Sequence, residues 1–515
     1  SDIFCAAPDA VYTGTGVRSP TESGLSSPLP SKNLPIPAGA ITVAALESAP
    51  DSEYVLYLDF DGETVTNTLW NLDDDYWEEL EDAGLVTLDL NDYPSIIALP
   101  QARADDEEWV ELVWQRVVED FAPFNINVTT DRAAFDAADV DKRVQAIITS
   151  TTTVTGPGVG GIAFLYSFRE DSPIVWVVNS DEGICASTIS HEAGHAFGLN
   201  HDSTSTEEYY AGHTGSYGPG WAPIMGAFFA DGFDDEVDQW SLGEYLDATN
   251  FEDDISIIGD DIDPQEGADP TAWSDALGED YYDLFYPNGI EISNGFGFRD
   301  DDLGDNIGDG NLGAFTIPEE NIIEGAGFIG RQSDVDLFEF TAPQGDLRIT
   351  VSPLDVNSIY VESGSESSGA NLAVNAQLLD ADGEVVFEGT GIAFRDNQLS
   401  SLIDTYVDGG TYYLKVEGGG RGDPESGFSD YGSLGQYSIF GELDLPPLMV
   451  AGGDKQTAAV FNGDITAETV NGTDFGFTVP SGTVIHTFLL ENVGTTLDVG
   501  DISVSLDSGT DFEFV

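Results

Sequence analysis

The chain has 515 residues, of which 41% are hydrophobic and 11% aromatic, so it can build folded cores over a length typical of about three domains. Its 95 acidic and 15 basic residues give a formal net charge of −80. Nucleic acids and anionic membranes bind proteins through basic residues, and no apolar run approaches the ~20 residues of a membrane-spanning helix. We therefore expect no nucleic-acid binding and no membrane insertion.

The first 51 residues are rich in Pro, Ser and Gly, which predicts an extended N-terminal arm. The sequence opens on Ser1-Asp-Ile-Phe, without the basic start and apolar stretch of an export signal. We expect any such signal to have been removed.

Residues 52–262 combine strands and helices in an order that predicts a mixed sheet backed by helices. Alternating or continuous apolar runs predict strands, and helical spacing of apolar residues predicts a helix that Pro123 ends. The predicted strands are 54–60, 125–129, 144–149, 161–166 and 174–178, and the predicted helix is 106–121.

The remainder of the chain is predicted to be mostly β-structure. Residues 263–325 form a loop-rich connector, residues 326–444 a β-sandwich, and residues 446–515 a second β-sandwich whose last strand is 511–515. Strands of the first sandwich are predicted at 336–340, 347–351, 375–379, 384–387, 411–416 and 436–440.

Three of the five histidines lie within eleven residues, in the pattern H-E-x-x-H-x-x-G-x-x-H. On a helix, His191 and His195 project from one face, and Glu192 lies beside that face. Gly198 can end the helix and let the chain turn back, so that His201 supplies a third nitrogen. Three neutral imidazoles with an open fourth position make a catalytic zinc site, and Glu192 would then act as general base.

Twenty-four residues after the third histidine, Met225 lies in the sequence Trp-Ala-Pro-Ile-Met-Gly. With this methionine, the chain resembles the metzincin zinc metallopeptidases, in which a "Met-turn" follows the zinc motif. Asp202 is similar to the adamalysin (reprolysin) branch, and the run from Gln239 to Tyr245 is similar to secreted bacterial members. The resemblance implies zinc ligation by the three histidines, a general base at Glu192, and a structural role for Met225 beneath the metal.

The same resemblance implies that the substrate lies extended along the edge strand of the sheet. The best candidate for this strand is Gly161, Ile162, Ala163 and Phe164. Some metzincins carry a metal-binding tyrosine two residues after the Met-turn methionine, but this chain has Ala227 there. The oxyanion donor therefore stays unassigned. His213 could bind substrate, or it could be a loop histidine without a catalytic role.

Cys5 and Cys185 are the only cysteines. The spacing Cys5-Ala-Ala-Pro-Asp resembles the propeptide switch of matrixin zymogens, in which a thiolate binds the zinc and keeps the enzyme latent. The preceding Pro-Arg of that switch is missing. A disulfide between Cys5 and Cys185 and two free thiols are the alternatives.

Residues 326–442 resemble the pre-peptidase C-terminal domain of secreted bacterial peptidases, on the segments 333–340, 378–383 and 410–416. Residues 448–515 look like an immunoglobulin-like module, on 471–476 and 487–494. These resemblances imply binding or spacer modules.

Acidic turns at Asp59–Gly62, Arg299–Asp302 and Asp380–Gly383 could hold Ca²⁺, which prefers clustered carboxylates, although Asp-Gly hairpin turns explain the first and third equally well. Most of the acidic charge fits a hydrated surface suited to saline surroundings.

We expect a multidomain protein with an α+β zincin catalytic domain, containing a mixed sheet and a zinc helix, followed by two all-β sandwich domains. Its expected activity is that of a secreted zinc endopeptidase that acts as a monomer on extracellular proteins or peptides. A surface adhesion protein with a latent or inactive peptidase domain is the alternative. A purely structural zinc site would require Cys5 as the fourth ligand.

Overall fold

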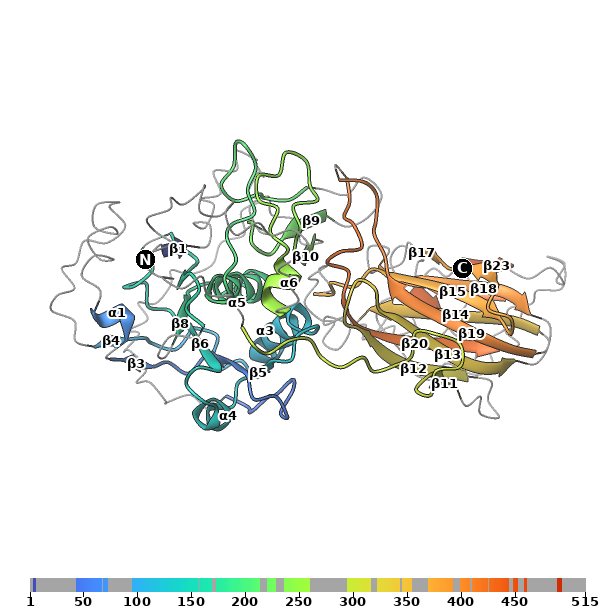
Figure 1. Cartoon of the computed structure of the whole chain (residues 1–515), viewed down its shortest axis with the longest axis horizontal. Coiled ribbons are helices and arrows are strands. Elements are labelled where there is room, and N and C mark those ends of the chain that lie inside the picture. Colours follow the sequence, from blue (N-terminus) through green and yellow to red (C-terminus); the bar gives the residue numbers. More distant parts are fainter. Residues whose placement is uncertain are drawn as a thin grey trace, which may run out of the picture.

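The computed structural model describes part of the chain. The described residues are 3–5, 43–66, 68–72, 95–156, 158–168, 173–213, 220–227, 236–259, 294–315, 322–342, 345–353, 369–391, 399–407, 410–424, 426–443, 448–452, 458–460 and 489–492. They form a mixed α/β multidomain protein with many sheets and few helices (Figure 1).

A six-stranded mixed sheet organises the N-terminal part of the described chain. Its order is β1-β7-β8-β6-β2-β5, with bounds β1 (Ile3–Cys5), β7 (Gly161–Phe164), β8 (Ile174–Val177), β6 (Arg143–Ile148), β2 (Val55–Asp59) and β5 (Asn127–Thr129). The four strands from β8 to β5 are parallel, whereas β7 runs antiparallel to β8 and to β1. Strands β2, β7 and β8 are buried along their whole length, which explains their continuous apolar sequences.

Two long helices pack against each other beside this sheet (Figure 1). Helix α3 (Glu107–Asp120) begins at Asp106, whose side chain accepts a hydrogen bond from the backbone N–H of Trp109. Helix α5 (Glu182–Phe197) is linked to α3 by an ion pair of 3.2 Å between Arg116 and Glu182. The predicted helix over 106–121 is therefore present, and it buries one face against the helix that carries the histidines.

Shorter elements surround this framework. They are β3 (Thr64–Val65) paired with β4 (Ile96–Ile97), β9 (Gly220–Pro223) paired in parallel with β10 (Glu236–Gln239), and the helices α1 (Leu69–Leu72), α4 (Arg132–Ala137) and α6 (Asp254–Gly259). None of these was predicted, because each is too short to show a periodic pattern of apolar residues.

Two five-stranded sheets form the predicted first β-domain (Figure 1). One has the order β11-β13-β19-β15-β16, with β11 (Gly313–Ala314), β13 (Val335–Ala342), β19 (Gly410–Gly418), β15 (Val374–Asp380) and β16 (Val385–Glu388). The other has the order β12-β20-β14-β18-β17, with β12 (Ile322–Ile329), β20 (Gly435–Leu443), β14 (Gly345–Pro353), β18 (Ser401–Val407) and β17 (Thr390–Gly391). All six predicted strands are present, and β11, β12, β17 and β18 are additional.

Only a three-stranded sheet is described in the last part of the chain, with β22 (Ala458–Val460), β21 (Leu448–Gly452) and β23 (Leu489–Asn492) in that order. The predicted final strand at 511–515 lies outside the described residues. Among the described helices, none is long and apolar enough to cross a membrane.

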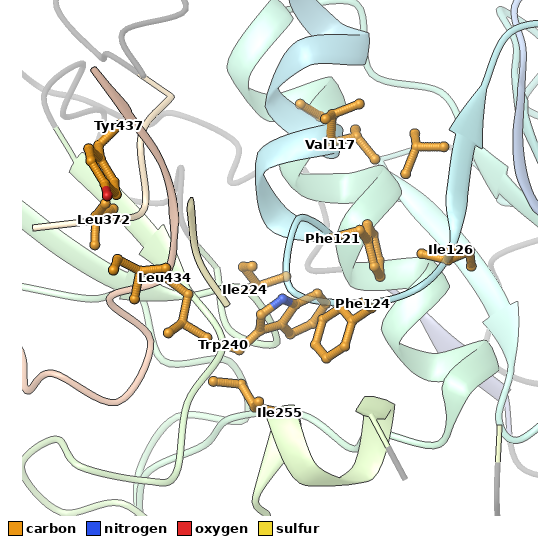
Figure 2. Packing of buried hydrophobic residues seen from close by; sticks show 14 of the residues in the cluster. Val117, Phe121, Phe124, Ile126, Ile224, Trp240, Ile255, Leu372, Leu434 and Tyr437 are labelled. Carbon is orange, nitrogen blue, oxygen red and sulfur yellow. The ribbon is translucent and has the colours of Figure 1, made fainter. Parts of the chain in front are cut away.

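The β-domain packs directly against the mixed α/β part through a shared hydrophobic core. Figure 2 shows Phe121 and Phe124, which follow α3, beside Trp240 and Ile255, with Leu434 of the β-domain close to them. The hydroxyl of Tyr431 accepts a hydrogen bond from the N–H of Ile255 (2.9 Å). The two parts therefore share buried side chains and buried hydrogen bonds.

The segment 294–315, predicted as part of a loop-rich connector, is packed against both parts. The Asn294 side chain donates to the carbonyl of Phe197, at the end of α5 (3.2 Å). The Phe296 ring contacts the Phe197 ring at a centroid distance of 5.4 Å. Likewise, the end of the predicted N-terminal arm runs beside β5, where Glu47 pairs with Thr129.

Candidate active site

Helix α5 presents the first two histidines of the motif, and a glycine turn brings in the third. The helix ends at Gly198, whose φ of 113° lies in the left-handed region that favours glycine. The chain then turns back, so that the His201 ring lies 4.8 Å from the His195 ring and 5.4 Å from the His191 ring, measured between centroids. All three side chains are buried.

Backbone carbonyls fix the orientation of the two helical imidazoles. Nδ1 of His191 lies 2.8 Å from the carbonyl oxygen of Ile224, and Nδ1 of His195 lies 2.7 Å from that of Leu199. Since carbonyls only accept, these contacts place a proton on each Nδ1 and leave each Nε2 with a lone pair. The same arrangement orients histidines that bind metals.

The lone pairs converge on one point. Nε2 of His195 and Nε2 of His201 lie 3.1 Å apart, and Nε2 of His191 has no hydrogen-bond partner among the described residues. One ring nitrogen from each histidine lies within 4.8 Å of the others. Two nitrogens bound tetrahedrally to one zinc at ~2.05 Å would be about 3.3 Å apart. The donor set therefore fits a zinc ion.

Burial keeps the three imidazoles neutral. It lowers the pKa of His191 to about 4, and it lowers the pKa of His195 and of His201, with a further contribution from the neighbouring rings. Neutral imidazoles are the form that binds metal, so no proton has to leave these rings at pH 7.

Met225 packs on the helix that carries the first two histidines. Its side chain is fully buried. Its sulfur lies close to Gly194 of α5, because a Cβ added at Gly194 would be only 2.6 Å from the Met225 sulfur. Its carbonyl accepts a hydrogen bond from the N–H of Asp202 (2.8 Å), the residue after the third histidine. The turn around Met225 thus packs on the helix and also holds the segment that carries His201.

Glu192 is fully buried between α5 and strand β7. A Cβ at Gly161 would lie 2.6 Å from its Oε1 and 2.7 Å from its Cγ. Glycine at the start of β7 therefore allows the strand to approach the carboxylate of Glu192, the residue that follows His191 in α5. The sequence pattern gave no indication of this contact.

Strand β7 is not the edge of the sheet. Residues 3–5 form β1, which pairs antiparallel with β7 so that Cys5 stands opposite Ile162 and Ile3 opposite Phe164. The prediction of Gly161–Phe164 as an edge strand is therefore wrong, because a short strand from the N-terminal arm occupies the position beside it. Ala163 stands opposite Phe4 in the same ladder.

The cysteines are not joined. Cys185 is a buried free thiol in α5, where burial raises the pKa of its thiol above the usual range. The disulfide alternative is therefore absent from this structure. The side chain of Cys5 lies outside the described residues, so its predicted contact with zinc stays a prediction.

His213 lies apart from the histidine cluster. Its Nε2 donates to the carbonyl of Gly427 in the β-domain (2.8 Å), and its Nδ1 lies 2.9 Å from the hydroxyl of Tyr210. This arrangement favours the alternative without a catalytic role. The sequence analysis missed Tyr209, whose ring lies 4.2 Å from the His201 ring, because no motif includes it.

Carboxylates and amides surround the backbone of the third histidine. The Asn250 side chain donates to the carbonyl of His201 (3.2 Å), and Glu252 accepts from both the backbone and the side chain of Asn200. The Tyr245 hydroxyl donates to Asp202 (3.3 Å) and to the carbonyl of Ser203 (3.0 Å). These bonds hold the loop after Gly198 in the position that the site needs.

Two buried imidazoles and a glutamate on one helix, with a third buried imidazole from the turn that follows, define the class of site found in zinc metallopeptidases. Residues 118–202, from α3 to the aspartate after the third histidine, match the family described as Metallo-peptidase family M12B Reprolysin-like. The resemblance to reprolysin-like metallopeptidases predicted from the sequence is thereby confirmed, and the matched segment contains the three histidines and Glu192.

Two solved structures are similar to part of the chain. The pre-peptidase C-terminal domain of a collagenase from Bacillus anthracis is 14% identical, covering 28% of this chain and 98% of that chain with a TM-score of 0.16. The periplasmic inhibitor of g-type lysozyme, PliG, from Aeromonas hydrophila is 13% identical, covering 26% and 97% with a TM-score of 0.15. No curated protein matches the chain.

Proposed function

We propose that the chain is a zinc-dependent endopeptidase of metzincin type, which hydrolyses peptide bonds of extracellular proteins. One observation carries the proposal, the convergence of three buried imidazole nitrogens on the helix that also carries the buried Glu192 and on the turn after it. The match of residues 118–202 to a metallopeptidase family gives independent support.

The residues divide the chemistry between them. His191, His195 and His201 would hold zinc, which lowers the pKa of a bound water to near 7 and polarises the scissile carbonyl. Glu192 accepts a proton from the attacking water and delivers it to the leaving amine. The histidine Nδ1–H groups, bonded to backbone carbonyls, keep the imidazoles in one tautomer throughout.

Strand β7 is proposed to bind the substrate main chain. Its backbone lies against Glu192, so a peptide paired with β7 would pass the carboxylate. In this structure residues 3–5 pair along the same strand, so such a peptide would have to displace them.

The test measures zinc content and hydrolysis of an unstructured protein such as casein, for the wild type and for Glu192→Gln. Both proteins should bind one zinc, and the variant should lose activity by about 10²–10⁴-fold, the usual contribution of a general base. A form lacking residues 1–42 should be at least as active as the full chain. A zinc-loaded protein that cleaves nothing in either form would refute the proposal.

The pairing of β1 with β7 favours a second candidate, a surface adhesion protein whose peptidase domain is latent. In that case the full chain is inactive and the form lacking residues 1–42 cleaves casein. If the shortened form is also inactive although it binds zinc, adhesion without any peptidase activity is favoured.

We further propose that the protein is secreted and acts as a monomer in saline surroundings. The proposal rests on the net charge of −80, which keeps molecules apart and is screened by salt. Light scattering over a range of salt concentrations tests the monomeric state, and a dimer at every concentration would contradict it.

A further inference from the structure

Three aspartates of the β-domain region bring their carboxylates together, far from the histidines in the sequence. Asp301 belongs to the segment 294–315, Asp334 to the turn before β13, and Asp336 to β13 itself. One oxygen of each lies within 4.8 Å of the others. The acidic turn at 299–302 is thus joined by two carboxylates from a different part of the chain.

Each of the two buried carboxylates uses only one of its oxygens within the protein. Oδ2 of Asp334 accepts a hydrogen bond from the N–H of Gly330 (2.6 Å), and Oδ2 of Asp336 accepts one from the hydroxyl of Tyr437. Oδ1 of both residues has no hydrogen-bond partner among the described residues, although their side chains are only 8% and 0% exposed. A buried carboxylate oxygen without a partner is costly unless a cation satisfies it.

Within the described part of the chain, no basic side chain forms an ion pair with this cluster. None of the ion pairs between described residues includes Asp301, Asp334 or Asp336. The two nearest basic residues in the sequence make other contacts, since Arg299 donates to the carbonyl of Phe124 and Arg331 lies over the ring of Phe298.

Burial raises the pKa of both buried carboxyl groups, and the neighbouring aspartates raise it further. Burial, followed by the charges of Asp301, Asp305 and Asp302, raises the pKa of Asp334 to about 6. Burial and the charges of Asp302, Asp334 and Asp301 raise the pKa of Asp336 to about 8, against the opposing effect of the Tyr437 hydroxyl. Without a cation, Asp336 therefore keeps its proton at pH 7, and a cation bound beside it would favour the charged carboxylate.

We propose that Asp301, Asp334 and Asp336 form a calcium site. All its protein ligands are carboxylate oxygens, which suit a hard cation and not zinc. Ca²⁺ binds oxygens at 2.3–2.6 Å, so two oxygens on one ion can be up to about 5 Å apart, and the three carboxylate oxygens, which all lie within 4.8 Å of one another, meet this limit. Water and nearby carbonyls would complete its six to eight ligands.

The position of the site gives it a mechanical role. Asp301 follows directly on residues that hold the α/β part, where Asn294 donates to the carbonyl of Phe197 and the N–H of Arg299 donates to the carbonyl of Pro123 (2.9 Å). Asp334 and Asp336 belong to the β-domain. A bound Ca²⁺ would therefore link the segment 294–315, which contacts the end of the histidine helix, to the β-domain.

The test uses the full, zinc-loaded chain stripped of other divalent ions and titrated calorimetrically with CaCl₂ at high salt, which screens unspecific attraction to the acidic surface. The wild type should bind one Ca²⁺ at this site, and Asp336→Asn should bind it at least about tenfold more weakly because one ligand charge is lost. Asp382→Asn is the matched control, because Asp382 is an exposed aspartate in a turn of the same domain.

Asp301→Asn guards against misfolding, because Asp301 is exposed and its replacement leaves the buried pair intact. This variant should also weaken the binding of Ca²⁺. In the wild type, Ca²⁺ should slow hydrogen exchange of residues 294–305, and in both site variants it should not. The proposal would be overturned if Asp301→Asn and Asp336→Asn bound Ca²⁺ as tightly as the wild type. It would also be overturned if Asp382→Asn lost as much affinity for Ca²⁺ as the two site variants.

Discussion

Replacing Gly161 by alanine tests whether β7 positions the carboxylate of Glu192. The added Cβ would lie 2.6 Å from Oε1, while ordinary contacts begin at 3.4 Å, so the carboxylate or the strand must move by about 0.8 Å. A misplacement of about 1 Å in a catalytic group can cost about 100-fold in rate. We therefore expect kcat/KM to fall by about 100-fold, or about 2.7 kcal/mol.

Zinc content, thermal unfolding and hydrolysis of a quenched peptide are measured together. Zinc content should stay at the wild-type value because the atoms nearest to a Cβ at Gly161 belong to Glu192 and Thr188, whereas overpacking should lower stability by about 1–3 kcal/mol. Gly310→Ala is the control, since a Cβ there meets nothing within 4 Å. A folded Gly161→Ala protein with wild-type activity would refute the placement of Glu192 against β7.

Three further changes test other contacts. Gly194→Ala places a Cβ 2.6 Å from the Met225 sulfur, so denaturant unfolding should show a loss of about 1–3 kcal/mol, and unchanged stability would contradict the packing. Burial raises the pKa of Glu119 from 4.5 to about 8. Between these pH values the folded protein keeps a proton on Glu119 that the unfolded chain releases. The contribution of Glu119 to the unfolding free energy therefore falls as pH rises from 4.5 to about 8. Glu119→Gln should remove this part of the slope in unfolding experiments at several pH values; an unaltered slope would count against it. Tyr431→Phe leaves the buried N–H of Ile255 without its acceptor and should lower the unfolding free energy by about 1–3 kcal/mol. Differential scanning calorimetry would detect this loss as a lower Tm. An unchanged Tm would speak against this interdomain hydrogen bond.

The histidine cluster could be predicted because its geometry is local. Helical spacing places His191 and His195 on one face, and Gly198, three residues before His201, ends the helix through its own left-handed φ. Five strands of the mixed sheet and six strands of the β-domain were also predictable, since buried strands are marked by continuous or alternating apolar residues.

The contacts that complete the site could not be predicted, because their partners are distant in sequence or lack a side-chain signal. The acceptors for His191 and His195 are the backbone carbonyls of Ile224 and Leu199, and any residue type offers a carbonyl. The approach of Gly161 to Glu192 depends on how β7 packs on α5. The edge-strand prediction failed because β1 has only three residues and lies in a Pro-rich arm.

The hydrogen bond from Asn294 to the carbonyl of Phe197 joins residues 97 positions apart. Synthesis proceeds from the N-terminus, so the whole histidine motif leaves the ribosome long before Asn294 and Phe296 do. The end of the histidine helix can reach its final packing only after this later segment arrives. The nascent chain therefore passes through a stage in which all the metal ligands are present but the helix that carries two of them is incompletely supported.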